Sequence, residues 1–265
     1  MSNHALNPWL ALMVGNSRLH WAWFIDESLQ WAWDTPQLSA NAIATLIQHQ
    51  LDFNACPEAI PQGLANPPSG LPLWFASVAP AQTSLWQAYA PQHIMLDQIP
   101  LAGLYPTLGI DRALALFGAA KTRGLPVLVI DAGTALTLTG ANAEGSLIGG
   151  AILPGLQLQL RSLNEHTAAL PPLNAQEFKT LPPRWVCNTP EAIQSGVIYT
   201  LLAGLRDFME SWLHQFPESA IVLTGGDSLL IEHSCQQQFP QLAALVQRDP
   251  YLIFWGMRSV RQTLI

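Results

Sequence analysis

The sequence predicts an α/β protein built from two similar halves. A length of 265 residues allows one large domain or two small ones. Each half opens with a buried strand, a tight glycine turn and a second strand, followed by alternating helices and strands. Superposing LALMVGNS on VLVIDAGT places Gly15 on Gly133 and Met13 on Asp131, which indicates an internal duplication.

The first half begins with an apolar run at 9–14, which predicts a buried strand ending at a Gly-Asn-Ser turn. Alternation with period two at 19–24 and 30–34 predicts two more strands. The other expected elements are helices at 39–51, 81–89 and 109–124, strands at 73–78 and 93–96, and loops at 54–72 and 97–109.

Paired as a hairpin, these two alternating strands place Trp21 opposite Trp33 and Trp23 opposite Trp31 in one register. Four tryptophans on one face could stack a ligand. The favoured interpretation is a sheet face packed under a helix or a subunit.

The second half repeats the opening with strands predicted at 126–131, 135–140 and 146–152. A helix is expected from Pro154, because proline is favoured at the first helical position. A long amphipathic helix at 189–216, a strand at 220–227 that runs into a glycine turn, and a final helix at 251–264 complete the chain. We expect two domains, 1–122 and 123–265.

Composition excludes several classes of protein. Apolar residues make up 49% and charged residues 11%, which is not the composition of a disordered chain. The net charge is −7, and Lys121 and Lys179 are the only lysines, so no nucleic-acid partner is expected. Neither a secretory leader nor a membrane-spanning run is recognisable, so we expect a cytoplasmic protein without a membrane partner. Three dispersed cysteines and seven scattered histidines predict neither disulfides nor a zinc site.

Five glycine-containing segments could carry chemistry. Each alone predicts only a turn, but their order along one chain is more specific. Two such turns facing each other would cradle phosphate with backbone N–H groups. The segments are VGNS (14–17), GIDR (109–112), DAGT (131–134), GGAILPG (149–155) and TGGD (224–227).

Together with NTPEAIQSG (188–196) and DPYLIFWGM (249–257), this set resembles the type III pantothenate kinases, of the actin, sugar-kinase and Hsp70-like ATPase superfamily. The resemblance runs from about residue 9 to residue 257. It implies two ribonuclease-H-like domains around a cleft, and a homodimer. It also implies ATP-dependent phosphorylation of pantothenate to 4′-phosphopantothenate, the first step toward coenzyme A, with Mg²⁺ and a monovalent cation, K⁺ or NH₄⁺.

Asp111 and Arg112 are the candidate catalytic residues. Asp111 starts a helix after a glycine, where backbone amides favour the ionised carboxylate that could accept a hydroxyl proton. Arg112 could stabilise phosphate charge through several donors. The alternative is that Asp111 is a helix cap and Arg112 a surface residue.

The resemblance assigns further binding residues. Thr189 would reach the substrate across the dimer, although Thr before Pro is also a normal helix N-cap, and both roles can hold. The implied substrate site comprises Tyr105, Gly109, Ile110, Asp111, Arg112 and Thr189.

The ATP and cation sites are expected at the two glycine turns. Asp131 ends a buried strand, where a cation would offset the cost of desolvating its carboxylate, and the resemblance implies a monovalent cation there. The alternative is that Asp131 only bonds local N–H groups. TGGD resembles the adenosine-side turn of the superfamily. The implied ATP contacts are Gly15, Asn16, Ser17 and Thr134.

One departure from the family concerns Met13. The family pattern Asp-x-Gly-Asn-Thr is represented here by Met13 to Ser17, so the carboxylate expected to hold Mg²⁺ is replaced by a thioether. His20 stands where the family has a basic residue.

This departure leaves three functional interpretations. The favoured one is a working kinase whose metal is held by ATP phosphates, water and other carboxylates. The second is a binding or regulatory protein similar to Bvg accessory factor. The third is another phosphoryl-transfer enzyme of the superfamily.

Overall fold

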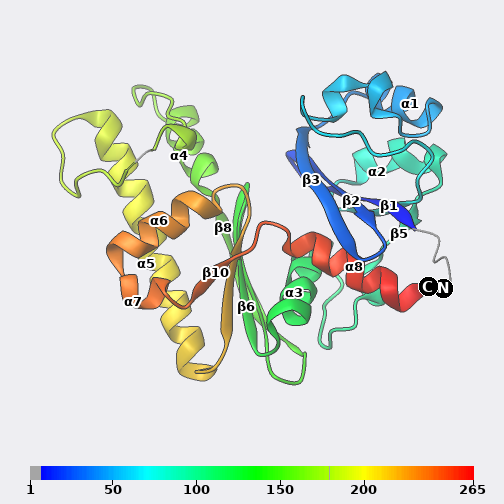
Figure 1. Ribbon diagram of the computed structural model, residues 1–265. Coiled ribbons are helices and arrows are strands. Elements are labelled where there is room, and N and C mark those ends of the chain that lie inside the picture. Colours follow the sequence, from blue (N-terminus) through cyan, green and yellow to red (C-terminus); the bar gives the residue numbers. More distant parts are fainter. Residues whose placement is uncertain (1–6, 179) are drawn as a thin grey trace. The chain divides into compact units, whose positions relative to one another are not determined.

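The computed structural model describes residues 7–178 and 180–265. The chain divides into two compact units, each with its own sheet and helices (Figure 1). The first unit contains the described residues up to Pro100, together with Leu104–Gly118 and Ile253–Ile265, and the second contains Leu101–Gly103 and Ala119–Leu252. The C-terminal segment therefore packs with the N-terminal part of the chain. The domain boundary expected at 122/123 stays a prediction.

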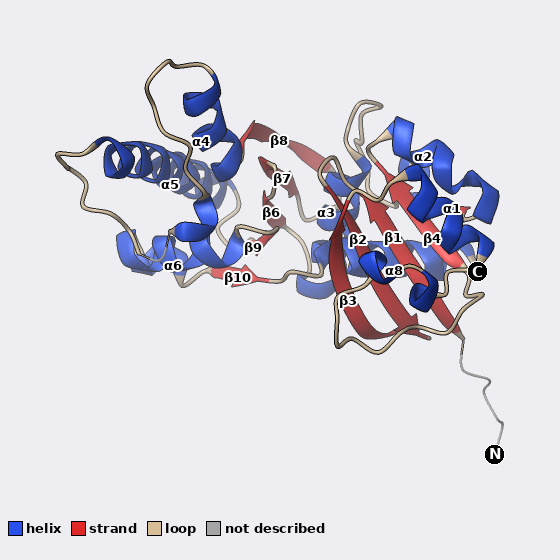
Figure 2. Ribbon diagram, turned by 90° about the horizontal axis from the view of Figure 1, so that it is seen from above, coloured by secondary structure: helices blue, strands red, loops and turns tan. Residues whose placement is uncertain are grey.

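The first unit contains a five-stranded sheet in the order β3-β2-β1-β4-β5. Figure 2 shows β3, β2, β1 and β4 side by side in this sheet. Its strands are β1 (Pro8–Val14), β2 (Arg18–Ile25), β3 (Ser28–Pro36), β4 (Leu73–Ser77) and β5 (Gln92–His93). Its helices are α1 (Ala40–Gln48), α2 (Pro80–Trp86), α8 (Leu252–Leu264, all but its first residue) and the part of α3 (Ile110–Arg123) that ends at Gly118.

The hairpin register predicted for the tryptophans is confirmed. Trp21 pairs with Trp33 and Trp23 with Trp31 across β2 and β3. Trp21 and Trp33 stack with ring centroids 6.0 Å apart, and Trp21 meets Trp86 of α2 edge to face. Trp21 and Trp33 are buried, whereas Trp31 is 43% exposed. Most of the patch is therefore a sheet face packed beneath helices.

The opposite face of this sheet is covered by α8. Trp9 stacks on Phe24, and Phe24 meets Trp255 of α8 edge to face. Gly256 of α8 lies against the backbone of Leu114 in α3, where a Cβ would collide. Glycine here allows the two helices to cross closely.

The second unit repeats this architecture with a sheet in the order β10-β9-β6-β7-β8. Its strands are β6 (Val127–Ala132), β7 (Ala135–Ala141), β8 (Leu147–Pro154), β9 (Ala220–Thr224) and β10 (Val246–Arg248). Its helices are α4 (Leu156–Glu165), α5 (Thr189–Gln215), α6 (Ser228–Gln238) and α7 (Pro240–Ala243).

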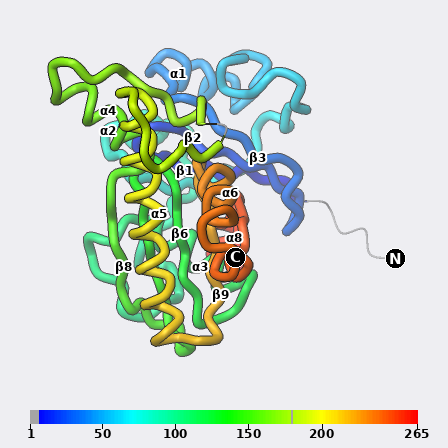
Figure 3. The backbone as a smooth tube through the Cα atoms, turned by 90° about the vertical axis from the view of Figure 1, so that its left-hand side faces the viewer, coloured from blue at the N-terminus to red at the C-terminus, as the bar shows by residue number. Residues whose placement is uncertain are grey.

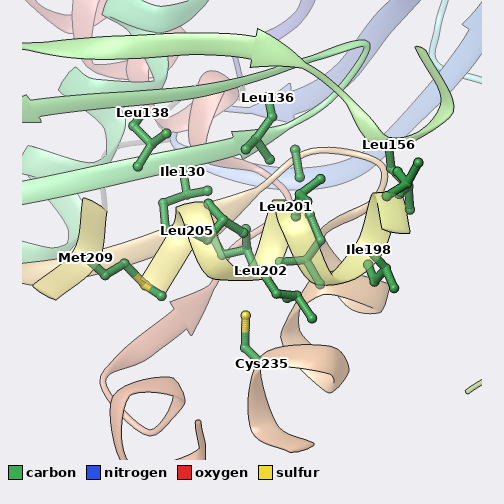
Figure 4. Close-up of a cluster of buried hydrophobic side chains, with 14 of the residues drawn as sticks. Ile130, Leu136, Leu138, Leu156, Ile198, Leu201, Leu202, Leu205, Met209 and Cys235 are labelled. Atoms are coloured by element: carbon green, nitrogen blue, oxygen red, sulfur yellow. The ribbon is translucent and has the colours of Figure 1, made fainter. Parts of the chain in front are cut away.

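Helix α5 supplies much of the core of this unit. Its apolar face packs against Ile130, Leu136 and Leu138 of the sheet (Figure 4). Helix α6 contacts α5 (Figure 3) and contributes buried Cys235. Burial raises the pKa of that thiol to about 12, so it packs as a neutral side chain.

The two sheets share one topology, which bears out the duplication. In each, the first strand pairs antiparallel with the second and parallel with the fourth. Met13 is the residue before the last of β1, and Asp131 is the residue before the last of β6. The two residues therefore occupy equivalent positions.

Several local predictions were wrong. Pro154 does not start a helix: it pairs with Ala135 as the last residue of edge strand β8, and α4 begins at Leu156 with Gly155 as its cap. An edge position tolerates proline because its missing N–H leaves no ladder bond unmade. The strand expected at 93–96 is β5, at Gln92–His93. The elements α6, α7 and β10 were not foreseen.

Among the described residues, no helix is both long enough and apolar enough to cross a bilayer.

Candidate active site

The start of α3 brings four of the predicted residues together. Gly109 accepts the first helical hydrogen bond, from the N–H of Ala113, at 3.1 Å. A Cβ on Gly109 would collide with the Asp111 carboxylate, so any other residue at this position would displace that carboxylate. The Asp111 Oδ1 atom accepts a hydrogen bond from the backbone N–H of Arg112 at 2.8 Å.

Arg112 is the buried cation of this cluster. The residue is 8% exposed, and its Nη1 donates to the Tyr105 hydroxyl at 3.2 Å. Tyr105 remains 42% exposed. The helix start thus presents a carboxylate, a guanidinium and a phenol, which together can accept a proton and stabilise an anion. Arg112 is not the surface residue of the alternative hypothesis.

The first glycine turn follows β1. The Gly15 N–H donates to the Arg18 carbonyl at 2.9 Å, and the Gly15 carbonyl accepts from Gln37 Nε2 at 2.7 Å. Asn16 and Ser17 are exposed at the tip. Gly15 therefore shapes the turn, while its two neighbours face outward, where a phosphate can approach.

Met13 lies in β1, two residues before Gly15, and is 1% exposed. Its thioether is not a ligand for Mg²⁺, which prefers oxygen. No group of three or more His, Cys, Asp or Glu side chains suited to a metal occurs in the described part of the chain. The residues of the first turn do not fit a protein-held Mg²⁺ ion.

The second glycine turn joins β6 to β7. Thr134 is exposed at its tip, and its carbonyl accepts from the Gly155 N–H at 2.9 Å. Asp131 pairs laterally with Thr137 on β7 and with Thr224 on β9, so their side chains emerge on one face of the sheet. A carboxylate flanked by two hydroxyls is a set of hard oxygen donors that fits a monovalent cation.

The turn after β9, at Gly225 to Asp227, packs against the end of β6. Gly225 has φ +91°, and a Cβ there would lie 2.5 Å from Asp131 Oδ1. The Asp227 N–H donates to the Ala132 carbonyl at 2.9 Å, and burial raises the pKa of the Asp227 carboxyl. TGGD is therefore built around the end of β6. The sequence motifs include Thr224 as the first residue of TGGD but do not connect Thr224 or Thr137 with Asp131; the strand register does.

Thr189 is the first residue of α5, and it is exposed. The N-cap is Asn188, whose side chain accepts from the Glu191 N–H at 3.0 Å. The interpretation of Thr189 as the cap was wrong, because the asparagine one position earlier fills that role. The Thr189 hydroxyl is not needed to start the helix.

Comparison with known proteins gives consistent matches. The type III pantothenate kinase family matches residues 9–211. A type III pantothenate kinase from Nostoc sp. is 50% identical, over 98% of this chain and 96% of its own length. One from Synechocystis sp. is 42% identical, over 98% of this chain and 93% of its own.

Solved structures support the fold alone. A conserved putative Baf family transcriptional activator from Campylobacter jejuni aligns with TM-score 0.61 at 19% identity, over 96% of this chain and 98% of that one. The activator of the 2-hydroxyisocaproyl-CoA dehydratase from Clostridium difficile, solved with bound ADPNP, aligns with TM-score 0.52 at 8% identity, over 97% of both chains. The two five-stranded sheets and these neighbours bear out the predicted α/β, actin-like ATPase fold built on a duplicated ribonuclease-H-like unit.

Proposed function

The chain belongs to the type III pantothenate kinase family, and on this premise we propose that it transfers the γ-phosphoryl group of ATP to the 4′-hydroxyl of pantothenate. The products are 4′-phosphopantothenate and ADP, and the reaction is the first step of coenzyme A biosynthesis. The observation that carries the proposal is the cluster of Asp111, Arg112 and Tyr105 at the start of α3.

Asp111 is the general base. The hydroxyl oxygen attacks the γ-phosphorus, its proton passes to the Asp111 carboxylate, and ADP leaves with the electron pair of the broken P–O bond. Arg112 stabilises the negative charge of the transferring group, which its burial strengthens. Tyr105, Gly109 and Ile110 form the pantothenate side of the site.

Asn16 and Ser17, at the exposed tip of the first turn, are proposed ATP contacts, and Gly15 sets the shape of that turn. Thr134, at the exposed tip of the second turn, is a proposed ATP contact of the second unit. Asp131 holds a monovalent cation, K⁺ or NH₄⁺, whose positive charge offsets phosphate charge. Met13 offers Mg²⁺ no ligand, so the metal enters as part of the ATP complex. These roles rest on the oxygen donors and exposed turns described above.

The enzyme is a homodimer in which Thr189 of one protomer reaches the pantothenate of its partner. Exposure of Thr189 and the presence of a separate cap at Asn188 support a role other than helix initiation. Free cysteines at 56, 187 and 235 suit the reducing cytoplasm, where we place the protein.

A coupled assay with pantothenate, ATP, Mg²⁺ and K⁺ tests the proposal. Asp111→Asn should reduce kcat by about 10²- to 10⁴-fold, the range expected for loss of a general base. Equilibrium binding of ATP should stay close to that of the parent, because the substitution is isosteric.

The matched control is Asp97→Asn, which changes an exposed aspartate of the same unit and should keep parental turnover. Parental turnover in Asp111→Asn would overturn the assignment of the base. Absence of turnover in the parent at every Mg²⁺ concentration would favour a binding protein.

A further inference from the structure

Gln37 lies beside the first glycine turn, although it is 22 residues from Gly15 in the chain. Arg18 at the start of β2 pairs with Pro36 at the end of β3, so the residue after Pro36 reaches the turn that precedes Arg18. There the Gln37 side chain donates from Nε2 to the Gly15 carbonyl at 2.7 Å. This bond ties the segment after β3 to the turn after β1.

The backbone on both sides of Gln37 is held in place. Pro36 has a fixed φ and ends β3. Leu38 is 6% exposed and belongs to the core of the first unit. Ser39 caps α1 by accepting from the Ala42 N–H at 3.1 Å. The Gln37 amide is therefore attached to a segment with little freedom to move.

The hydrogen bond from Gln37 sets the direction of the next backbone donor. The peptide bond between Gly15 and Asn16 is trans, and in a trans peptide the carbonyl and the following N–H point in opposite directions. Holding the Gly15 carbonyl toward Gln37 therefore directs the Asn16 N–H away from Gln37. Asn16 is exposed at the tip of the turn, where an outward N–H can donate to a phosphate oxygen.

Stability of the fold does not account for glutamine at this position. The Oε1 atom of Gln37 is buried, and no described residue donates a hydrogen bond to it. Burying an acceptor without a partner costs more than one neutral hydrogen bond contributes. A residue that is costly to the fold is typical of a functional site.

We propose that Gln37 is a positioning residue of the kinase, which orients the peptide between Gly15 and Asn16 so that the Asn16 N–H donates to the phosphates of ATP. Gln37 does not touch ATP and acts through the Gly15 carbonyl. The inference rests on the proposed function, because it requires ATP phosphates at the first turn.

The substitution Gln37→Met tests the role of the amide. Methionine is unbranched and flexible like glutamine, but it has no donor. The Kd for ATP, measured by titration calorimetry without pantothenate, should rise by about 3- to 10-fold, as expected for the loss of one neutral hydrogen bond. The KM for pantothenate should not change. The denaturant midpoint should equal or exceed that of the parent, because the buried Oε1 is removed.

Nuclear magnetic resonance reports on the Asn16 N–H directly. With isotope-labelled asparagine, the Asn16 signal is the one that disappears in an Asn16→Gln variant. Saturating ATP should shift this signal in the parent, and the shift should be smaller in Gln37→Met. A loss of stability elsewhere in the fold would not change this signal selectively.

The matched control is Gln30→Met. Gln30 lies near the start of β3 and also donates from Nε2 to a backbone carbonyl, that of Ser28, at 3.1 Å. The same type of bond is thereby removed from the same unit, at the opposite end of the strand. Gln30→Met should bind ATP with the parental Kd.

A folded Gln37→Met variant that binds ATP with parental affinity would overturn the proposal, and so would an Asn16 signal that ATP does not shift in the parent. An equal rise in the Kd for ATP and the KM for pantothenate would indicate general loosening and would also overturn it. A parent that binds ATP without phosphorylating pantothenate would refute the proposed function, while the Kd values would still decide the role of Gln37. A parent that does not bind ATP would overturn both.

Discussion

At the scale of single residues, the equivalent ends of β1 and β6 carry side chains of different chemistry. Asp131 and Met13 hold equivalent positions, but Asp131 pairs with Thr137 and Thr224, whereas Met13 pairs with His20 and Ala76. The second strand end therefore offers oxygen donors, and the first offers a thioether beside an imidazole. We expect the two ends to differ in which ions they support.

Met13→Asp should lower the Mg²⁺ concentration needed for half-maximal turnover. A carboxylate adds a hard oxygen ligand beside the phosphate turn, so less free metal is required. Turnover at limiting Mg²⁺ should rise, and a Mg²⁺ titration of the kinase rate measures both effects.

Met13→Leu is the control, since it keeps the apolar packing without adding a ligand. A parent that saturates at low Mg²⁺, together with a Met13→Asp variant that is no better, would contradict this account.

Asp131→Ala should abolish or sharply shift the dependence of activity on K⁺ or NH₄⁺. Asp131 would supply the one charged oxygen ligand of the proposed cation site. The hydroxyls of Thr137 and Thr224 alone would hold a monovalent cation weakly. Rates in K⁺ and in Na⁺-only buffers measure the dependence.

Asp207→Ala, on the exposed side of α5, serves as the matched control and should retain the parental cation response. Equal parental rates in the two buffers would refute the cation site.

At the scale of elements, the start of α5 assigns helix capping to one residue and leaves the next residue exposed. Asn188 caps the helix and Thr189 does not. Asn188→Ala should lower the free energy of unfolding by about 1 kcal/mol, the typical cost of losing an N-cap.

Thr189→Ala should leave the unfolding free energy unchanged and raise the KM for pantothenate, if the threonine serves the substrate. Denaturant unfolding and substrate kinetics on both variants separate the two roles. A destabilised Thr189→Ala variant with normal kinetics would reverse our assignment.

Two elements of the second unit, α6 and β10, could not be predicted from the sequence pattern. Helix α6 was not predicted because it buries Ser228 and Ser234 and exposes Leu229, so its apolar residues do not recur at helical spacing on one face. Within the described part of the chain, short β10 pairs with β9 alone, and nothing local in its three residues indicates a strand.

At the scale of the whole molecule, the second unit leaves apolar side chains uncovered. Edge strand β8 exposes Ile148 and Ile152 at 46% and 64%, and an unprotected apolar edge favours association. Trp185 is 90% exposed. These surfaces are where we expect the second protomer to bind.

Ile148→Arg should therefore shift the protein from dimer toward monomer, because an unpaired charge in an apolar interface is costly to desolvate. Multi-angle light scattering measures the mass, and the pantothenate KM should rise if the partner's threonine is withdrawn. Leu229→Arg, exposed on α6, is the control. A parent that is monomeric and fully active would refute the shared site.

Features that depend on residues close together in the chain could be predicted without the structure. Alternation of side chains set the register of Trp21 against Trp33, and the contiguous motif at Gly109 to Arg112 placed a carboxylate and a guanidinium on one helix start. Such features follow from local periodicity and turn chemistry, which a linear pattern records.

Contacts between distant segments could be read only from the folded chain. It placed α8 against α3 through Gly256, aligned Asp131 with Thr224, and brought Asp34 to His20. These pairings depend on which strands become neighbours and on how closely two backbones approach. Both are set by the packing of the core, which no short stretch of sequence contains.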